Sequence, residues 1–292
     1  MKRFFILASA AIVALASCAK TEVVYNDAPE EIAFKQITNV MTKADDLSGS
    51  MGVYAYYNGA SYFGKTEFAQ QTGETYWTAA DPKYWPVSGN VGFVMYAPFD
   101  ATVESTSMDN LTFTKSAGDN KDLLYGTVTS AKTQNAVPVT FNHALTNVFV
   151  NVKGDASVTL VSVELLEVGD AGTGEVDFSN SKVTWTATAV KSPVIYNTEQ
   201  ALSSTPIPCT SCLVLPAEEL DEQQIKLTYK VAGSVGNLTY TTDTGVGTNV
   251  LGTAWESGKK YIYNITVGVD EIMFDADVAD WTEGNGASGK DL

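Results

Sequence analysis

The stretch 224–231 reads QIKLTYKV and contains the pattern that decides the fold. Apolar Ile225, Leu227, Tyr229 and Val231 alternate with polar residues at every step. A period of two places successive side chains on opposite faces of a β-strand. The stretch therefore predicts a strand with one face in a core and the other in water.

Runs of the same kind recur along the chain, and no comparably long stretch carries a helical stripe. They are rich in Val, Tyr, Ile and Thr, and residues that favour turns bound them. Many short strands between turns favour β-sandwiches over an α/β sheet, which needs helical crossovers. We therefore predict an all-β chain. The runs are 51–57, 91–96, 146–152, 158–168 and 261–269.

The N-terminal residues depart from this pattern. Residues 1–17 begin with two basic residues, continue as a short apolar run and end in small residues before Cys18. The run is well short of the ~20 apolar residues that cross a bilayer, so it predicts a cleaved signal peptide. The polar stretch 18–30 is interpreted as a tether.

Residues 15–18 read LASC and resemble the lipobox of bacterial lipoproteins, in which the cysteine sulfur takes a diacylglyceryl group. Each buried methylene contributes ~0.8 kcal/mol, and stable anchoring takes at least two lipid chains. Lipidation at Cys18 would therefore hold the protein on a membrane surface. The alternative is an ordinary secretory peptide that contains a cysteine.

Composition limits the partners and the size of the core. The chain has 18 Lys and Arg against 34 Asp and Glu, a formal net charge of −16, which disfavours nucleic acid and anionic membranes as partners. A hydrophobic fraction of 45% allows a large core, and 292 residues favour two domains. We place these domains at 31–142 and 143–292.

No motif indicates catalysis or a cofactor. His143 is the single histidine of the sequence, and it has no obvious partners for nucleophilic or metal chemistry. It is interpreted as a structural residue at the domain junction. Paired carboxylates fall in turns or polar connections, which favours a solvated surface. Glycosidase activity, which needs two carboxylates at a fixed separation in a cleft, is the enzymatic alternative. Glycine-rich phosphate cradles are missing from the sequence. We expect no catalytic residue, no metal and no cofactor.

Cys209 and Cys212 have the C-x-x-C spacing of redox motifs. A redox-active pair places its thiolate at a helix N-terminus, whereas here the apolar stretch 213–216 follows and predicts a strand. Tetrahedral zinc would need two further ligands. Two states stay open: a local disulfide, or two free thiols.

Aromatic residues concentrate between positions 54 and 85. Tyrosine and tryptophan fill sandwich cores, which is the favoured interpretation, and they also form platforms on which sugars stack. The second interpretation describes a surface lipoprotein that captures glycan and never polymerises. The residues are Tyr54, Tyr56, Tyr57, Tyr62, Tyr76, Trp77, Tyr84 and Trp85.

A set of short motifs spans nearly the whole mature chain. They are LASC at 15–18, TKA at 42–44, MGVYAY at 51–56, YWP at 84–86, GFVMYAP at 92–98, FNHAL at 141–145, LVLP at 213–216, WESGKKYIYNITV at 255–267 and DW at 280–281. In this order they resemble the fimbrillin family of Bacteroidales surface fibres, the subunits and anchors of the type V pilus.

The resemblance implies two tandem transthyretin-like β-sandwich domains that assemble by donor-strand exchange. In that family the precursor reaches the outer membrane as a lipoprotein, and a trypsin-like protease removes the lipid together with the first strand. A C-terminal strand of a neighbouring subunit then fills the open groove. The implied partners are other fimbrial subunits, the processing protease and, through the lipid, the outer membrane; the implied location is the cell surface and then the fimbrium.

Residues here fit that scheme in part. The removable strand is expected at 31–37, with Ile32, Phe34 and Ile37 toward the core. Lys43 is the candidate cleavage site. Lys35 is the second choice, because it lies inside the strand. At the other end, 271–281 suits a last sandwich strand or a donor, with one apolar face made by Ile272, Phe274, Ala276 and Val278.

Overall fold

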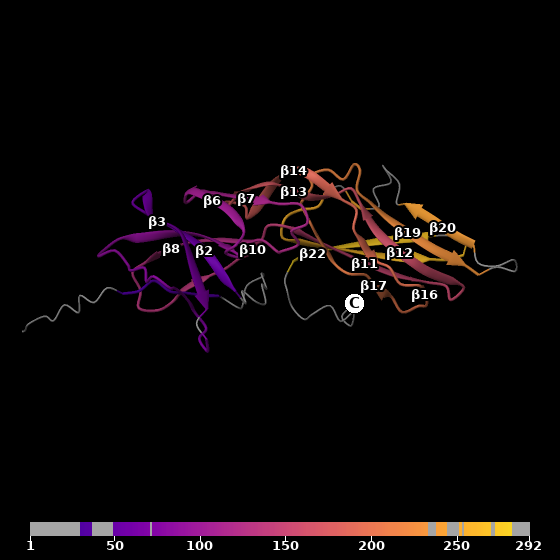
Figure 1. Cartoon of the computed structure of the whole chain (residues 1–292), viewed down its shortest axis with the longest axis horizontal. Helices are drawn as coiled ribbons and strands as arrows, with labels where there is room; N and C mark the ends of the chain where they lie inside the picture. Colours follow the sequence, from indigo (N-terminus) through magenta and orange to yellow (C-terminus); the bar gives the residue numbers. More distant parts are fainter. Residues whose placement is uncertain are drawn as a thin grey trace, which may run out of the picture.

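The computed structural model describes an elongated, all-β molecule. Figure 1 shows the strands of the first half of the chain at one end of the long axis and those of the second half at the other. Every regular element within the described residues is a β-strand, which confirms the all-β prediction. The described residues are 30–36, 49–70, 72–232, 238–243, 251–252, 254–269 and 272–281.

The first half is built on an eight-stranded sheet in the order β10-β8-β5-β2-β3-β4-β1-β9. Its neighbouring strands are antiparallel except β1 and β9, which run parallel. One core cluster contains its fully buried Val53, Phe68 and Phe93. The strands are β1 (Phe34–Gln36), β2 (Ser50–Tyr57), β3 (Ala60–Gln70), β4 (Trp77–Ala79), β5 (Asn90–Ala97), β8 (Leu124–Ala131), β9 (Val137–Val139) and β10 (Asn142–His143).

Two five-stranded sheets form the second half and share one core. The first has the order β17-β11-β21-β22, with β18 also on β11; the second has the order β15-β12-β19-β20, with β16 also on β12. Buried residues of both sheets belong to one cluster, as in a β-sandwich. The strands are β11 (Thr146–Gly154), β12 (Val158–Leu166), β15 (Val194–Tyr196), β16 (Gln200–Ala201), β17 (Ile207–Pro208), β18 (Cys212–Val214), β19 (Gln224–Val231), β20 (Leu238–Asp243), β21 (Lys259–Val267) and β22 (Ile272–Asp280).

A fourth sheet, in the order β14-β13-β7-β6, joins the two halves. Strand β7 comes from before the predicted boundary at His143, and it pairs with β13 from after it. Residues of both halves accordingly share a third core cluster. The division at His143 stays a prediction, because this sheet draws strands from both sides of it. The strands are β6 (Thr102–Ser107), β7 (Asn110–Lys115), β13 (Val168–Asp177) and β14 (Lys182–Lys191).

The predicted strands are found, with one correction. Strand β19 has the bounds of the alternating stretch, and its Ile225 and Leu227 are fully buried. The run 158–168 was expected as one strand, but the structure divides it into β12 and β13. Glu167 between them has a φ of 53°, a left-handed conformation that interrupts an extended strand.

Candidate functional site

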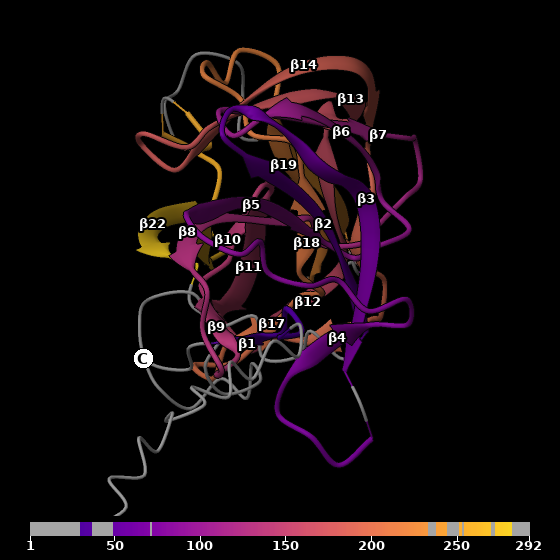
Figure 2. The ribbon, with the colours of Figure 1, turned by 90° about the vertical axis from the view of Figure 1, so that its left-hand side faces the viewer.

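The N-terminal segment, residues 30–36, lies inside the first sheet. Its strand β1 sits between β4 and β9, with Phe34 opposite Trp77 on one side and Val137 on the other. Figure 2 shows β1, β4 and β9 together at the lower side of the molecule. We call the space that the segment fills the slot; β4, residues 83–85 and β9 form its walls.

Two side chains anchor the segment in the core. Ile32 and Phe34 are both 0% exposed. The Phe34 ring meets the rings of Phe68 and Phe93 edge to face, each at a centroid distance of 5.0 Å. Burial of two large apolar side chains contributes roughly 3–6 kcal/mol, and the aromatic contacts add to it. The alternation in the sequence correctly placed both residues toward the core.

Backbone hydrogen bonds join the segment to both walls of the slot. On one side the Ile32 amide donates to the Lys83 carbonyl at 2.7 Å, and the Trp85 amide donates to the Glu30 carbonyl at 3.0 Å. On the other side the Val137 amide donates to the Ala33 carbonyl at 2.7 Å. The two walls thus bond to the segment between them.

Without its segment, the slot would expose apolar walls and unpaired backbone groups. Val137 and Val139 are 0% and 1% exposed, and Trp77 is 5% exposed, so the walls are apolar. Backbone donors such as the Trp85 amide would lose their partners. Unpaired strand edges beside an apolar groove bind an added strand with apolar residues at alternate positions. The arrangement can therefore hold this segment or another strand of the same pattern.

Of the two lysines predicted as cleavage sites, only Lys35 lies within the described residues. Lys35 is exposed and pairs with Pro138 inside the β1–β9 ladder, so a cut after it would divide β1. Lys43 lies outside the described residues, as do Ile37 and the predicted lipid site Cys18.

The candidate donor or last strand is β22, which forms a continuous antiparallel ladder with β21 from Ile272 to Asp280. Ile272 and Phe274 are half-buried against the second core, whereas Ala276 is exposed and Val278 is 58% exposed. Strand β22 is thus the last strand of a sheet in its own chain.

Cys209 and Cys212 are two free thiols, not a disulfide. Both are free and buried, in the core of the second half. Burial raises the pKa of the Cys209 thiol to about 12 and also raises the pKa of the Cys212 thiol. Scarce thiolate makes both thiols weak nucleophiles and poor metal ligands.

His143 joins the two halves of the molecule. Its ring lies 3.7 Å from the Trp281 ring at an angle of 11°, and its Nδ1 lies 2.6 Å from the Asp122 carboxylate. His143 and Trp281 are 2% and 5% exposed. The sequence prediction of a structural histidine at the junction agrees with this geometry, although the two partners were not foreseen.

Of the eight concentrated aromatic residues, three are buried, three are half-buried and two are exposed. Tyr56, Trp77 and Trp85 are buried in the cores, while Tyr62 and Tyr84 are 38% and 42% exposed. The sequence pattern did not indicate that Trp85 and β9 form walls of the slot. Strand β9 reads VPV and is too short for its alternation to stand out, and Trp85 was noted only for its ring.

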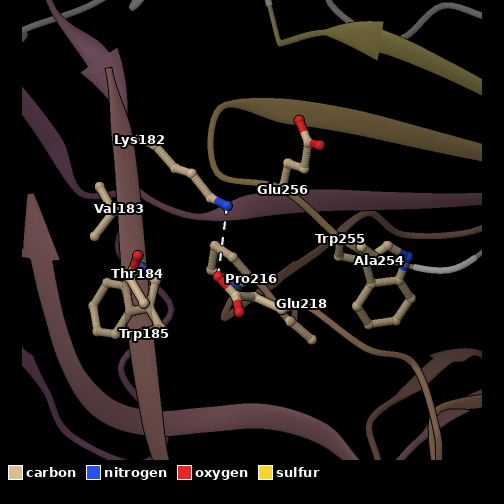
Figure 3. A pocket seen from close by; sticks show the side chains of 10 residues that line it. Lys182, Val183, Thr184, Trp185, Pro216, Glu218, Ala254, Trp255 and Glu256 are labelled. Carbon is tan, nitrogen blue, oxygen red and sulfur yellow. Dashed lines mark ion pairs between the residues drawn. The ribbon is translucent and has the colours of Figure 1, made fainter. Parts of the chain in front are cut away.

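A small hollow of about 130 Å³ lies in the second half, beside β14 (Figure 3). Lys182 and Glu218 face each other across it at 3.6 Å, and Trp185 and Trp255 lie on its two sides. The Trp185 Nε1 already donates to the Ala144 carbonyl at 2.8 Å. The hollow therefore offers little room for a ligand, and Lys182 and Glu218 are already paired with each other.

The described residues contain no group of three or more His, Cys, Asp or Glu side chains placed to hold a metal ion. Among the same residues, no helix is long and apolar enough to cross a membrane.

The fold and the slot define a class of all-β protein in which an early strand completes the first sheet. The profile of the fimbrillin-like family matches residues 36–281, and the chain belongs to that family. No curated protein matches the sequence.

Solved structures share the fold over most of the chain. A fimbrial protein of Bacteroides vulgatus has a TM-score of 0.62 at 14% identity, with 86% of this chain and 99% of that chain covered. A candidate cell adhesion protein of Bacteroides uniformis has a TM-score of 0.60 at 23% identity, with 86% and 98% covered. At these identities the likeness establishes the fold alone.

Proposed function

We propose that this protein is a structural subunit of a bacterial surface fibre, and that its N-terminal segment is a removable strand. Loss of the segment opens the slot, and a strand from a second subunit fills it. Membership of the fimbrillin-like family supports the fibre. The observation that carries the mechanism is the complete burial of Ile32 and Phe34 between two walls that both bond to the segment.

Side-chain burial and backbone hydrogen bonds would make the bound strand of a second subunit slow to dissociate. An incoming strand must replace the roughly 3–6 kcal/mol of side-chain burial that Ile32 and Phe34 contribute, together with the backbone bonds at both walls. A strand with large apolar residues at alternate positions meets both demands. The proposal requires no catalytic residue and no cofactor in this chain.

Export and processing complete the proposal. Lipidation at Cys18 brings the precursor to the outer membrane, where a trypsin-like protease cuts after Lys43. The cut releases the lipid together with the segment that fills the slot. The partners are then other fimbrial subunits, and the location changes from the outer membrane to the fimbrium.

The test treats the full lipidated chain with a trypsin-like protease and determines the new N-terminus and the mass of the product. We expect a start at Ala44 and a ladder of oligomers. Lys43→Ala should prevent both results, whereas Lys121→Ala, which changes an exposed lysine paired with Asp100, should change neither. Product that loses the segment and stays monomeric would refute strand exchange.

The lipid has a separate test. Cys18→Ala should abolish labelling by fatty acid and leave a soluble or unprocessed species. Continued labelling of this variant would contradict the assignment of Cys18 and leave the slot untouched.

A further inference from the structure

One wall residue of the slot carries a buried polar group without a partner. Trp85 is 6% exposed, and its ring meets the Phe93 ring edge to face at a centroid distance of 5.7 Å, in the core cluster that contains Ile32 and Phe34. The indole Nε1 is buried, yet it has no hydrogen-bond acceptor among the described residues. The wall of the slot therefore holds an unused donor.

Three further tryptophans show the usual arrangement, in which the indole N–H donates a hydrogen bond. Trp77 donates to the Gly49 carbonyl at 3.3 Å, Trp185 to the Ala144 carbonyl at 2.8 Å and Trp255 to the Tyr263 hydroxyl at 2.8 Å. Buried donors in folded proteins are nearly always paired, so an unpaired one calls for an explanation. The exception, Trp85, lies in the wall of the site that the proposed function uses.

The N-terminal segment does not supply the missing acceptor. Glu30 lies directly across the ladder from Trp85, and the alternation that turns Ile32 to the core gives Glu30 the same face. The Glu30 carboxylate is held instead by the loop before β9. The Gln134 Nε2 donates to its Oε1 at 3.2 Å, and the Lys132 Nζ lies 3.9 Å from its Oε2. The segment thus fills the slot but leaves one donor of the wall unpaired.

An unpaired donor favours the exchange of this segment for a different strand. A buried N–H without an acceptor costs free energy as long as the segment occupies the slot, and an occupant that brings an acceptor removes that cost. A difference in affinity between two occupants of one site is specificity. One neutral hydrogen bond in a buried site changes an affinity by roughly tenfold.

We propose that the Trp85 indole N–H selects the strand that enters the slot, and that the preferred strand carries an uncharged side-chain oxygen, of a serine, threonine, asparagine or glutamine, on its core face beside Trp85. This inference rests on the proposed function, because the incoming strand replaces the N-terminal segment. A carboxylate is disfavoured at this position, since its burial costs more than one hydrogen bond returns. Trp85 thus distinguishes the strand of a partner subunit from the segment of its own chain.

The first experiment measures this selection by peptide binding. Protease-treated protein is titrated with an acetylated peptide of residues 30–36 and with its Glu30→Gln and Ile32→Thr variants, which place an amide or hydroxyl oxygen at the two core-face positions nearest to Trp85. Trp85→Phe removes the N–H and keeps an aromatic ring. It should weaken one of the oxygen-bearing peptides roughly tenfold and leave the affinity of the unchanged peptide as it was.

The comparison is made within each peptide, between two proteins, so the cost of replacing Ile32 itself cancels. The matched control is Trp255→Phe, because Trp255 is 2% exposed, belongs to the second core and has a bonded indole N–H. This control should bind all three peptides as the wild type does.

Each outcome of the titration decides the proposal. Equal affinities of Trp85→Phe and the wild type for both oxygen-bearing peptides overturn it, because the N–H then recognises no acceptor. A roughly tenfold loss for the unchanged peptide also overturns it, since the native segment would then already use the N–H. If the wild type binds none of the three peptides, the proposed function fails and this inference fails with it.

A second experiment uses the uncleaved chain and does not depend on an open slot. Urea denaturation compares Trp85→Phe with Trp255→Phe, which remove the same atoms from two buried indoles. The urea midpoint should fall less in Trp85→Phe, because only Trp255 loses a hydrogen bond, to the Tyr263 hydroxyl. An equal or larger fall in Trp85→Phe would show that its N–H is already bonded while the segment is in place, which overturns the proposal.

Discussion

The strands nearest the two chain ends, β1 and β22, are held in opposite ways. Strand β1 is only three residues long, but Ile32 and Phe34 of the N-terminal segment are buried completely. Strand β22 pairs along its whole length with β21, yet most of its side chains are exposed. Side-chain burial therefore fixes the first strand, and the backbone ladder fixes the last.

Removal of β1 and removal of β22 would expose different amounts of apolar surface. Removal of β1 exposes an apolar wall on each side, because β1 lies between β4 and β9. Removal of β22 exposes the edge of β21 and takes away two half-buried side chains, Ile272 and Phe274, that pack against the second core. A site that demands a replacement strand is therefore found at β1. Directly after β22, Trp281 packs into the cluster between the halves and adds to the backbone ladder.

The largest expected effect follows from truncating the anchor of β1. Phe34→Ala removes a fully buried ring between Phe68 and Phe93, and we expect the free energy of unfolding to fall by about 4 kcal/mol. Urea denaturation of the uncleaved protein measures it. Lys35→Ala, the adjacent exposed residue, should change it by less than about 0.5 kcal/mol. Equal effects of the two variants would show that β1 is held by its backbone, as β22 is.

A smaller effect is expected at the end of β22. Trp281→Ala removes a side chain that stacks on His143 and belongs to the cluster between the halves, so we expect a loss of about 3 kcal/mol. Val278→Ala changes an exposed residue of β22 itself and should cost less than about 0.5 kcal/mol.

Hydrogen exchange reports on the opening of each of the two strands separately. In Trp281→Ala the amides of β22 should exchange faster, while those of β9 in the slot keep their protection. Faster exchange in both regions would mean that the two strands are coupled through the junction at His143.

Local pattern predicted the strands of this molecule better than it predicted their partners. The alternation in 224–231 specified β19 and its buried face, because periodicity is a local property of the chain. Phe34, by contrast, pairs with Val137, about a hundred residues later, in a strand of three residues that contains a proline. The sequence around either residue does not indicate the other, because pairing over such a separation depends on the packing of the whole core.

The sheet that joins the halves illustrates the same limit. Two domains were predicted on length and resemblance, yet β7 pairs with β13 across the proposed boundary. Within this sheet Lys115 is buried, and its Nζ donates to the Asp170 carbonyl at 2.6 Å. A charged residue in an alternating run is normally assigned to solvent. Its partner, 55 positions away, could not be read from the pattern.

The smallest expected effect concerns the reactivity of the two cysteines of the second half. We expect their alkylation to be unchanged after the N-terminal segment leaves the slot. Cys209 and Cys212 belong to a core cluster that shares no residue with the cluster around Phe34. Burial raises the pKa of Cys209 to about 12, so alkylation by iodoacetamide at pH 8 requires an opening of that core. We expect both thiols to stay unreactive in protease-treated protein and to react in urea. Because the fourth sheet ties the halves together, rapid alkylation after cleavage would instead mean that the defect at β1 spreads through β7 and β13 to the whole molecule.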